Sequence, residues 1–202
     1  MSRYFSKFPK LVYTKDGVST LVTDIITRIA TVKGTINNTS LYYEYSIQDG
    51  DTPEMIASKY YGDAELHWVV LLFNNIIDPF YDWPMSYSQF IYFISNKYGS
   101  IASAQTTTHH YERIEKSTDG YSGLTTTNTY IIDEDTYNDM PAEPTTSVKT
   151  LNNNTITVIT SRNLVTNYDY ENNTNESKRV IRLIKKDLMP DIKNQFEQLM
   201  GV

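Results

Sequence analysis

The sequence predicts an α+β protein, in which a small strand-helix-helix module carries extra helices, an N-terminal arm and helix, an extended β-hairpin region and a C-terminal helix. Apolar residues alternate over 41–47, and they recur at helical spacing over 53–60 and 86–98. Residues 106–176 contain Thr- and Asn-rich strand patterns that Gly and Pro interrupt. We therefore divide the chain into an arm with a short helix (1–40), the module with its following helix (41–100), the β-hairpin region (105–176) and a C-terminal strand and helix (177–202).

The composition limits the classes of function. The 202 residues carry a formal net charge of −6 and contain no cysteine. A negative chain repels a phosphate backbone, so we expect no nucleic-acid partner, and the lack of cysteine excludes disulfides and thiolate metal sites. No apolar segment reaches the length of a signal peptide or a membrane span, so we expect a protein made in a cytoplasm, with no membrane partner. The 17 tyrosines are typical either of protein interfaces or of strands whose rings face water.

The N-terminal arm contains aromatic residues in an irregular setting of Lys, Pro and Gly. Tyr4, Phe5 and Phe8 belong to a segment too short to bury their rings by itself, so we expect them to lie on another surface. Apolar residues at helical spacing then predict a short amphipathic helix from Thr20 to Thr31, with Gly34 near its end.

The module follows as a strand, a turn and two helices. Thr52 or Asp51 can cap the first helix, Pro53 suits its first position and Gly62 can end it in a left-handed conformation. The second helix contains "LHWVVLLF" and has almost no polar face. It must therefore be covered, either by the helix predicted over 86–98 or by another chain.

The remaining segments predict strands and a last helix. "HHYERI", "NTYIID" and "NTITVIT" indicate β-hairpins, and "KRVIRLI" indicates a further strand. "KKDLMPDIKNQFEQLM" predicts a terminal helix entered through Pro190, with Ile192, Phe196 and Leu199 on one face.

The histidines and carboxylates form no catalytic constellation. His67 lies on an apolar helix and is better explained as a hydrogen-bonded, partly buried residue than as a general base. His109 and His110 are adjacent on a predicted strand, so their side chains should point to opposite faces and not bind one metal easily. The acidic run over 133–139 lacks the glycine and glutamate of a calcium loop. We therefore expect no enzyme activity, no cofactor and no metal.

The order of the module is itself informative: a strand, "DGDTPE", a helix, "YG", a helix with a Trp, and "NN". This order resembles a LysM module, a small unit best known for binding peptidoglycan and chitin. LysM modules usually close with a strand that pairs with the first, whereas "IIDPFYDWPMS" follows here. The loops that differ are those that line the sugar groove in glycan-binding members. The resemblance is carried by Gly50, Asp51, Thr52, Ile56, Ala57, Tyr60, Gly62, Asn74 and Asn75.

A narrower resemblance covers most of the chain. The string from Asp49 to Pro84, together with "VTDIITRI", "KYG", "HHYE" and "YDYENNTNESKRVIRLIKKDLMPDIKNQFEQLM", is similar to the LysM-like baseplate wedge subunit of contractile-tailed bacteriophages related to T4. The resemblance implies a non-enzymatic structural protein of the virion, made in the host cytoplasm. It would dock onto other wedge proteins and help to join neighbouring wedges around the tail tube, with tail-tube or sheath-initiating proteins as further candidate partners.

Two functions thus follow from the sequence. The first is a structural docking protein of the baseplate. The alternative is a glycan-binding LysM module associated with cell-wall degradation, which would be expected to carry tandem repeats, a secretion signal or a catalytic domain. For the docking function, the expected interface residues are Tyr4, Phe5, Phe8, Trp68, Phe80, Tyr81 and Trp83.

Overall fold

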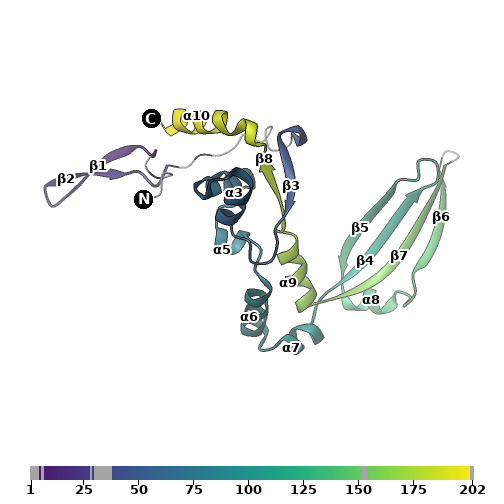
Figure 1. The fold of residues 1–202 in the computed structure, drawn as a ribbon. Helices are drawn as coiled ribbons and strands as arrows, with labels where there is room; N and C mark the ends of the chain where they lie inside the picture. The colour runs from purple at the N-terminus through teal and green to yellow at the C-terminus, as the bar shows by residue number, and fades with distance from the viewer. Residues whose placement is uncertain (1–4, 6, 28, 30–37, 152–153, 201–202) are drawn as a thin grey trace. The chain divides into compact units, whose positions relative to one another are not determined.

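The computed structural model describes residues 5, 7–27, 29, 38–151 and 154–200 (Figure 1). Helices and small antiparallel sheets occur together, which confirms the predicted α+β class. The chain divides into two compact units, one formed by Met1–Ser86 with Asn175–Val202 and the other by Tyr87–Thr174. The second unit is therefore an insertion into the sequence of the first.

The elements of the first unit are β1 (Lys10–Lys15), β2 (Val18–Thr23), η1 (Thr39–Leu41), β3 (Tyr42–Ser46), α3 (Pro53–Tyr61), η2 (Ala64–Leu66), α4 (His67–Phe73), α5 (Pro79–Asp82), β8 (Val180–Ile184), η3 (Lys186–Leu188) and α10 (Met189–Met200). Those of the second unit are α6 (Tyr87–Tyr98), α7 (Ile101–Thr106), β4 (Thr108–Asp119), β5 (Thr125–Ile132), α8 (Glu134–Asp139), β6 (Thr145–Leu151) and β7 (Asn154–Thr166), and α9 (Asn167–Glu176) runs from the second unit into the first.

The core of the first unit forms around a two-stranded antiparallel sheet. Strand β3 pairs with β8, so that Tyr42 lies opposite Ile184 and Ser46 lies opposite Val180. The strand missing after the second helix is thus supplied by the C-terminal part of the chain. Burying an aliphatic side chain contributes about 1.5–3 kcal/mol, so this core is a main source of stability. Its buried members are Ile47, Ile56, Ala57, Leu66, Val69, Val70, Phe73, Ile181, Leu183, Ile184 and Met189.

The ends of the first two helices follow the sequence signals. The Thr52 side chain accepts the Met55 N–H at the start of α3, and Gly62 ends this helix with φ +80°. Asp63 caps η2, which leads into α4. The predicted cap by Thr52 and the predicted end at Gly62 are therefore confirmed.

The terminal helix α10 is also confirmed, but its predicted buried face is partly wrong. Phe196 is buried and Ile192 packs on the core, whereas Leu199 is 67% exposed. Met200 is buried instead. Residues four apart lie on one helical face, so the inward stripe follows positions 192, 196 and 200.

The predicted helix from Thr20 to Thr31 is wrong where the structure describes it. Residues 18–23 form β2, which pairs with β1 in a hairpin, and Asp16 and Gly17 occupy the turn with φ +52° and +78°. Two positive φ values define a type I′ turn, for which Asp-Gly is a preferred pair. Residues 24–27 and 29 are not helical, while 28 and 30–37, including Gly34, lie outside the described residues.

The second unit contains a four-stranded antiparallel sheet in the order β5-β4-β7-β6. The strands predicted at "HHYERI", "NTYIID" and "NTITVIT" are confirmed as parts of β4, β5 and β7. The helix predicted over 86–98 is confirmed as α6. The sequence patterns did not predict α8 and α9.

The adjacent histidines do not point to opposite faces. The pairing of β4 with β7 shifts register between Thr108 and His110, and the Nδ1 atoms of His109 and His110 lie 2.7 Å apart. A bulge of this kind re-aims a side chain. His109 also stacks on Tyr170 at 3.8 Å between ring centroids. Across the described ranges, no three His, Asp or Glu side chains gather as a metal site.

A buried carboxylate joins two helices of the second unit. Glu171 on α9 is 9% exposed and accepts hydrogen bonds from Lys97 Nζ at 2.6 Å and from the Tyr98 hydroxyl at 2.8 Å on α6. The hydrogen bond to Glu171 raises the pKa of Lys97. The ammonium and the carboxylate therefore stabilise each other.

We expect Glu171→Gln to lower the free energy of unfolding by about 1–2 kcal/mol, because a charge-assisted bond is lost at a buried position. Urea denaturation followed by circular dichroism measures this change. Glu143→Gln is the control, because Glu143 is exposed in the segment between α8 and β6. Equal stability of the two variants would contradict a structural part for Glu171.

Candidate docking surfaces

The loop between β3 and α3 is organised by one buried carboxylate. Asp51 is 7% exposed and accepts hydrogen bonds from the Tyr45 hydroxyl at 2.8 Å, the Gln48 N–H at 3.1 Å and Lys59 Nζ at 2.7 Å. Burial opposes ionisation of this carboxyl, but the bonds from Lys59, Tyr45 and Gln48 outweigh burial and lower the pKa of Asp51. The carboxylate thereby connects the strand, the turn and the helix.

Trp83 joins the same loop through the backbone of Asp51. Its indole Nε1 donates a hydrogen bond to the Asp51 carbonyl oxygen at 2.9 Å, and its ring packs against the core of the first unit. The structure therefore places this expected interface residue largely inward. Trp83 fixes the end of the segment that carries α5.

The two asparagines after α4 have separate structural parts. The Asn74 amide donates to the Arg182 carbonyl at 2.9 Å, and its Oδ1 accepts the Arg182 N–H at 2.7 Å. Asn75 takes φ +54°, the Asn75 N–H donates to the Leu72 carbonyl, and the Ile76 N–H donates to the Leu71 carbonyl. These are the two bonds of a Schellman motif. The "NN" pair thus ends the helix and attaches it to β8.

The other motif positions also contribute to the fold. Ile56 and Ala57 are 1% and 0% exposed, Gly50 has φ +79°, and Tyr60 packs on the core beside Tyr61. Together with Thr52, Gly62, Asp51 and the two asparagines, every residue of the motif therefore has a role that requires no ligand.

Apolar side chains are exposed on the short helix α5 and on the residue Ile77 just before it, and we name Ile77, Phe80 and Tyr81 the α5 patch. They are 70%, 92% and 76% exposed, respectively. The backbone beneath them is fixed, because Asp78 accepts the Phe80 N–H and Asp82 accepts the N–H groups of Ile77 and Asp78. Lys178 also donates to the Tyr81 carbonyl. The structure thus holds exposed aromatic rings on a rigid support.

The other expected interface residues gather in an aromatic cluster. Phe8 is buried and lies 6.2 Å from Phe196 between ring centroids, and Trp68 lies 4.6 Å from Phe196. Phe5 is 48% exposed and lies 5.4 Å from Phe8. Tyr4 lies outside the described residues. The arm therefore contacts α10 of its own chain through Phe8, and Trp68 of α4 packs against the same cluster.

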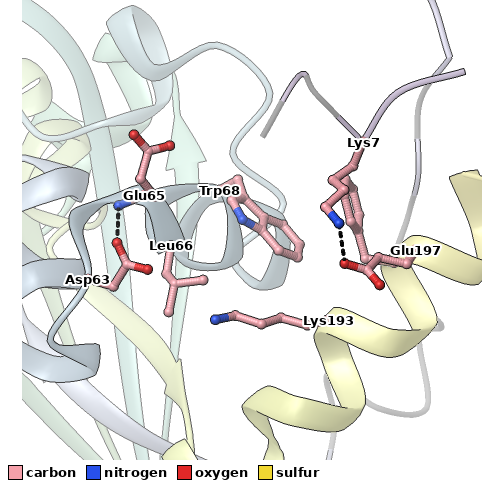
Figure 2. Close-up of a pocket in the computed structure, with 8 residues that line it drawn as sticks. Lys7, Asp63, Glu65, Leu66, Trp68, Lys193 and Glu197 are labelled. Carbon is pink, nitrogen blue, oxygen red and sulfur yellow. Dashed lines mark hydrogen bonds and ion pairs between the residues drawn. The ribbon is translucent and has the colours of Figure 1, made fainter. Parts of the chain in front are cut away.

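Beside this cluster lies a small cavity of about 170 Å³ (Figure 2). Lys7 and Glu197 form an ion pair at 2.8 Å on one side, and Figure 2 shows Lys193 extending from α10 toward Leu66 and Trp68. The volume is suited to one side chain rather than to a sugar chain. The full lining is Lys7, Asp63, Glu65, Leu66, Trp68, Lys193, Phe196 and Glu197.

The hairpin formed by β1 and β2 is a further apolar surface, which the sequence reading missed. Val12 and Leu21 lie opposite each other and are 66% and 65% exposed. A hydrogen-bonded pair flanks them on each side, formed by Lys10 with Thr23 and by Thr14 with Ser19. Two-stranded hairpins are marginally stable in water, so this one needs a surface to pack against. The Asp-Gly turn was the signal that could have identified it.

Comparison with known proteins defines the family to which the chain belongs. Residues 4–202 match the family model described as "Base plate wedge protein 53", and the chain therefore belongs to this family of baseplate wedge proteins. It is a structural protein of the tail baseplate.

A particular relative is the "Baseplate wedge protein gp53" of Enterobacteria phage T4, which is 33% identical over 72 residues. The match covers 36% of this chain and 37% of that protein. It supports the predicted assignment to wedge subunits related to T4.

The Asp51 network predicts a defined pH dependence. The folded state lowers the pKa of Asp51, so its contribution is present above the unfolded value near 4 and is lost as the pH falls through the folded value. The hydrogen bond to Asp51 raises the pKa of both Tyr45 and Lys59. Their contributions are present below about 10 and are lost as the pH rises through the raised values.

Asp51→Asn should therefore cost about 1–2 kcal/mol at neutral pH, with a smaller cost near pH 3. Denaturation of both proteins across this range gives the difference directly, and Asp139→Asn, on the exposed end of α8, serves as the control. A cost for Asp51→Asn that stays constant with pH would show that ionisation of Asp51 does not stabilise the fold.

Proposed function

We propose that this protein is a connector of the tail baseplate, which docks onto other wedge proteins and helps to join adjacent wedges around the tail tube. The single observation that supports this proposal is the set of apolar side chains exposed on ordered supports, above all Phe80 at 92% and Tyr81 at 76%. Tail-tube or sheath-initiating proteins are further proposed partners, and synthesis takes place in the host cytoplasm before assembly.

The α5 patch has the aromatic side chains and the ordered backbone that suit a docking contact. Aromatic residues are enriched among those that dominate binding energy, since each ring buries a large area with few rotatable bonds. Asp78 and Asp82 hold the backbone of α5 before any partner arrives. Binding therefore requires little further loss of conformational freedom.

The β1–β2 hairpin supplies a second contact of a different kind. Its exposed apolar side chains include Leu11, Val12, Val18 and Leu21, and they occur on both faces of the two strands. A partner that covers either face would stabilise the hairpin as it binds. We infer that the hairpin is the adaptable contact and the α5 patch is the rigid one.

A LysM-like scaffold is part of this proposal. Strand β3, helices α3 and α4, and strand β8 give the strand-helix-helix-strand order expected from the resemblance. The motif residues are occupied in caps, turns and core packing, and the cavity beside Trp68 is small. These features favour a scaffold that presents protein contacts over one that binds glycans.

Replacing Phe80 and Tyr81 together by Ser should leave the fold intact, because both side chains are exposed. We expect incorporation into baseplates to fall by at least about tenfold, which corresponds to about 1.4 kcal/mol. Complementation of a phage that lacks this gene, followed by quantification of the protein in purified baseplates, provides the measurement.

Tyr121→Ser is the matched control, since Tyr121 is 93% exposed but lies in a turn of the second unit. Its incorporation should be unchanged. Normal incorporation of the double variant would exclude the α5 patch as a docking contact. Retention of the protein on insoluble chitin or peptidoglycan, with competition by chito-oligosaccharide, would instead support the glycan-binding alternative.

A further inference from the structure

The two outer edges of the β3–β8 sheet differ in whether their outward backbone groups are hydrogen-bonded. The edge of β8 is closed at its centre, because the side-chain amide of Asn74 bonds to both the N–H and the C=O of Arg182. An asparagine amide presents a donor and an acceptor side by side, so here it substitutes for a neighbouring strand. Helix α4, which precedes Asn74, therefore protects this edge.

The edge of β3 has no such cover at its centre. Glu44 lies opposite Arg182 in the antiparallel register. Arg182 directs its backbone groups away from β3 toward Asn74, so the pair is not hydrogen-bonded, and the N–H and C=O of Glu44 point away from β8. Among the residues that the structure describes, neither group has a partner and no third strand joins this sheet.

The backbone hydrogen bonds at the two ends of the sheet support this assignment of which residues of β3 bond to β8. The Ile47 N–H donates to the Arg179 carbonyl and the Lys185 N–H donates to the Leu41 carbonyl, one at each end of the sheet. Alternate residues in an antiparallel strand bond to the same neighbour. Tyr43 and Tyr45 therefore bond to β8, while Glu44 between them faces outward.

We propose that the outer edge of β3 binds an extended segment of another baseplate protein by strand addition. This inference rests on the proposed docking function and specifies one way in which it is carried out. Unpaired backbone groups on an ordered strand are the feature that an added strand recognises, and pockets for side chains then give specificity. The β3 strand is pre-ordered by the Asp51 network through Tyr45.

The chemistry of the edge selects the partner. Glu44 is exposed and has no ion pair among the described residues, and the chain carries a net charge of −6. A Lys or Arg opposite Glu44 would make a favourable cross-strand pair. A second copy of this chain is disfavoured, because antiparallel pairing centred on this strand places Glu44 opposite Glu44. The expected occupant is thus a basic extended segment of a different protein.

Hydrogen exchange resolved to single amides tests this directly, on the full isolated chain and on the protein within purified baseplates. In the isolated chain the Glu44 amide should exchange fast, and those of Tyr43 and Tyr45 slowly. In the baseplate, exchange at Glu44 should slow by at least about tenfold, as it does for an amide within a ladder. An unchanged rate at Glu44, in baseplates that contain the protein, would overturn strand addition while leaving the docking function in place. If the protein is absent from baseplates, the docking function itself fails.

Two variants at position 44 distinguish the role of the backbone N–H from that of the side chain. Glu44→Pro removes the charge together with the outward N–H, a loss that edge positions tolerate, whereas Glu44→Thr removes the charge and keeps the N–H. We expect the Pro variant to melt like the wild type and to enter baseplates at least about tenfold less than the Thr variant. Equal incorporation of the two, or a Glu44 amide already protected in an isolated monomer, would overturn the proposal. A dimer of the isolated chain that Glu44→Pro abolishes would show that the edge binds a second copy instead.

Discussion

The Asp51 carboxylate is the interaction on which the first unit depends. It receives hydrogen bonds from the strand through Tyr45, from the turn through Gln48 and from the helix through Lys59, while its backbone carbonyl holds Trp83. A buried carboxylate is tolerated only when such partners compensate its lost hydration. Because Trp83 ends the segment that contains α5, Asp51 also positions the exposed rings of the α5 patch through its bond to Trp83. Asp51 thus stabilises the fold of the first unit and also fixes the position of the proposed docking surface.

The sheet of this unit depends on a long-range closure. Strand β8 follows the whole inserted second unit, and its pairing with β3 brings together residues more than one hundred positions apart. Asn74 secures this closure from the end of α4, with hydrogen bonds that take the place of a neighbouring strand on that edge. The arrangement leaves β3 as the open edge, so the way the module closes determines where another chain can be added.

Local signals in the sequence predicted much of the fold. The cap by Thr52, the left-handed Gly62, the strand of "KRVIRLI" and the last helix depend on neighbouring residues, and each was correct. The N-terminal helix was wrong, because the prediction followed the helical spacing that begins at Leu21 and Val22, whereas the Asp-Gly turn favours the observed hairpin. The pairing of β3 with β8 and the inward position of Trp83 depend on distant residues. No local pattern could predict these two features.

Electron cryo-microscopy of the assembled baseplate, at a resolution that shows side chains, tests the central claim most directly. We expect that Phe80, Tyr81, Val12 and Leu21, which are exposed in the isolated chain, become buried against other baseplate proteins. Trp83 should keep its hydrogen bond to the Asp51 carbonyl in that state. If Phe80, Tyr81 and the hairpin remain in contact with water in the finished assembly, neither the α5 patch nor the hairpin is a docking contact.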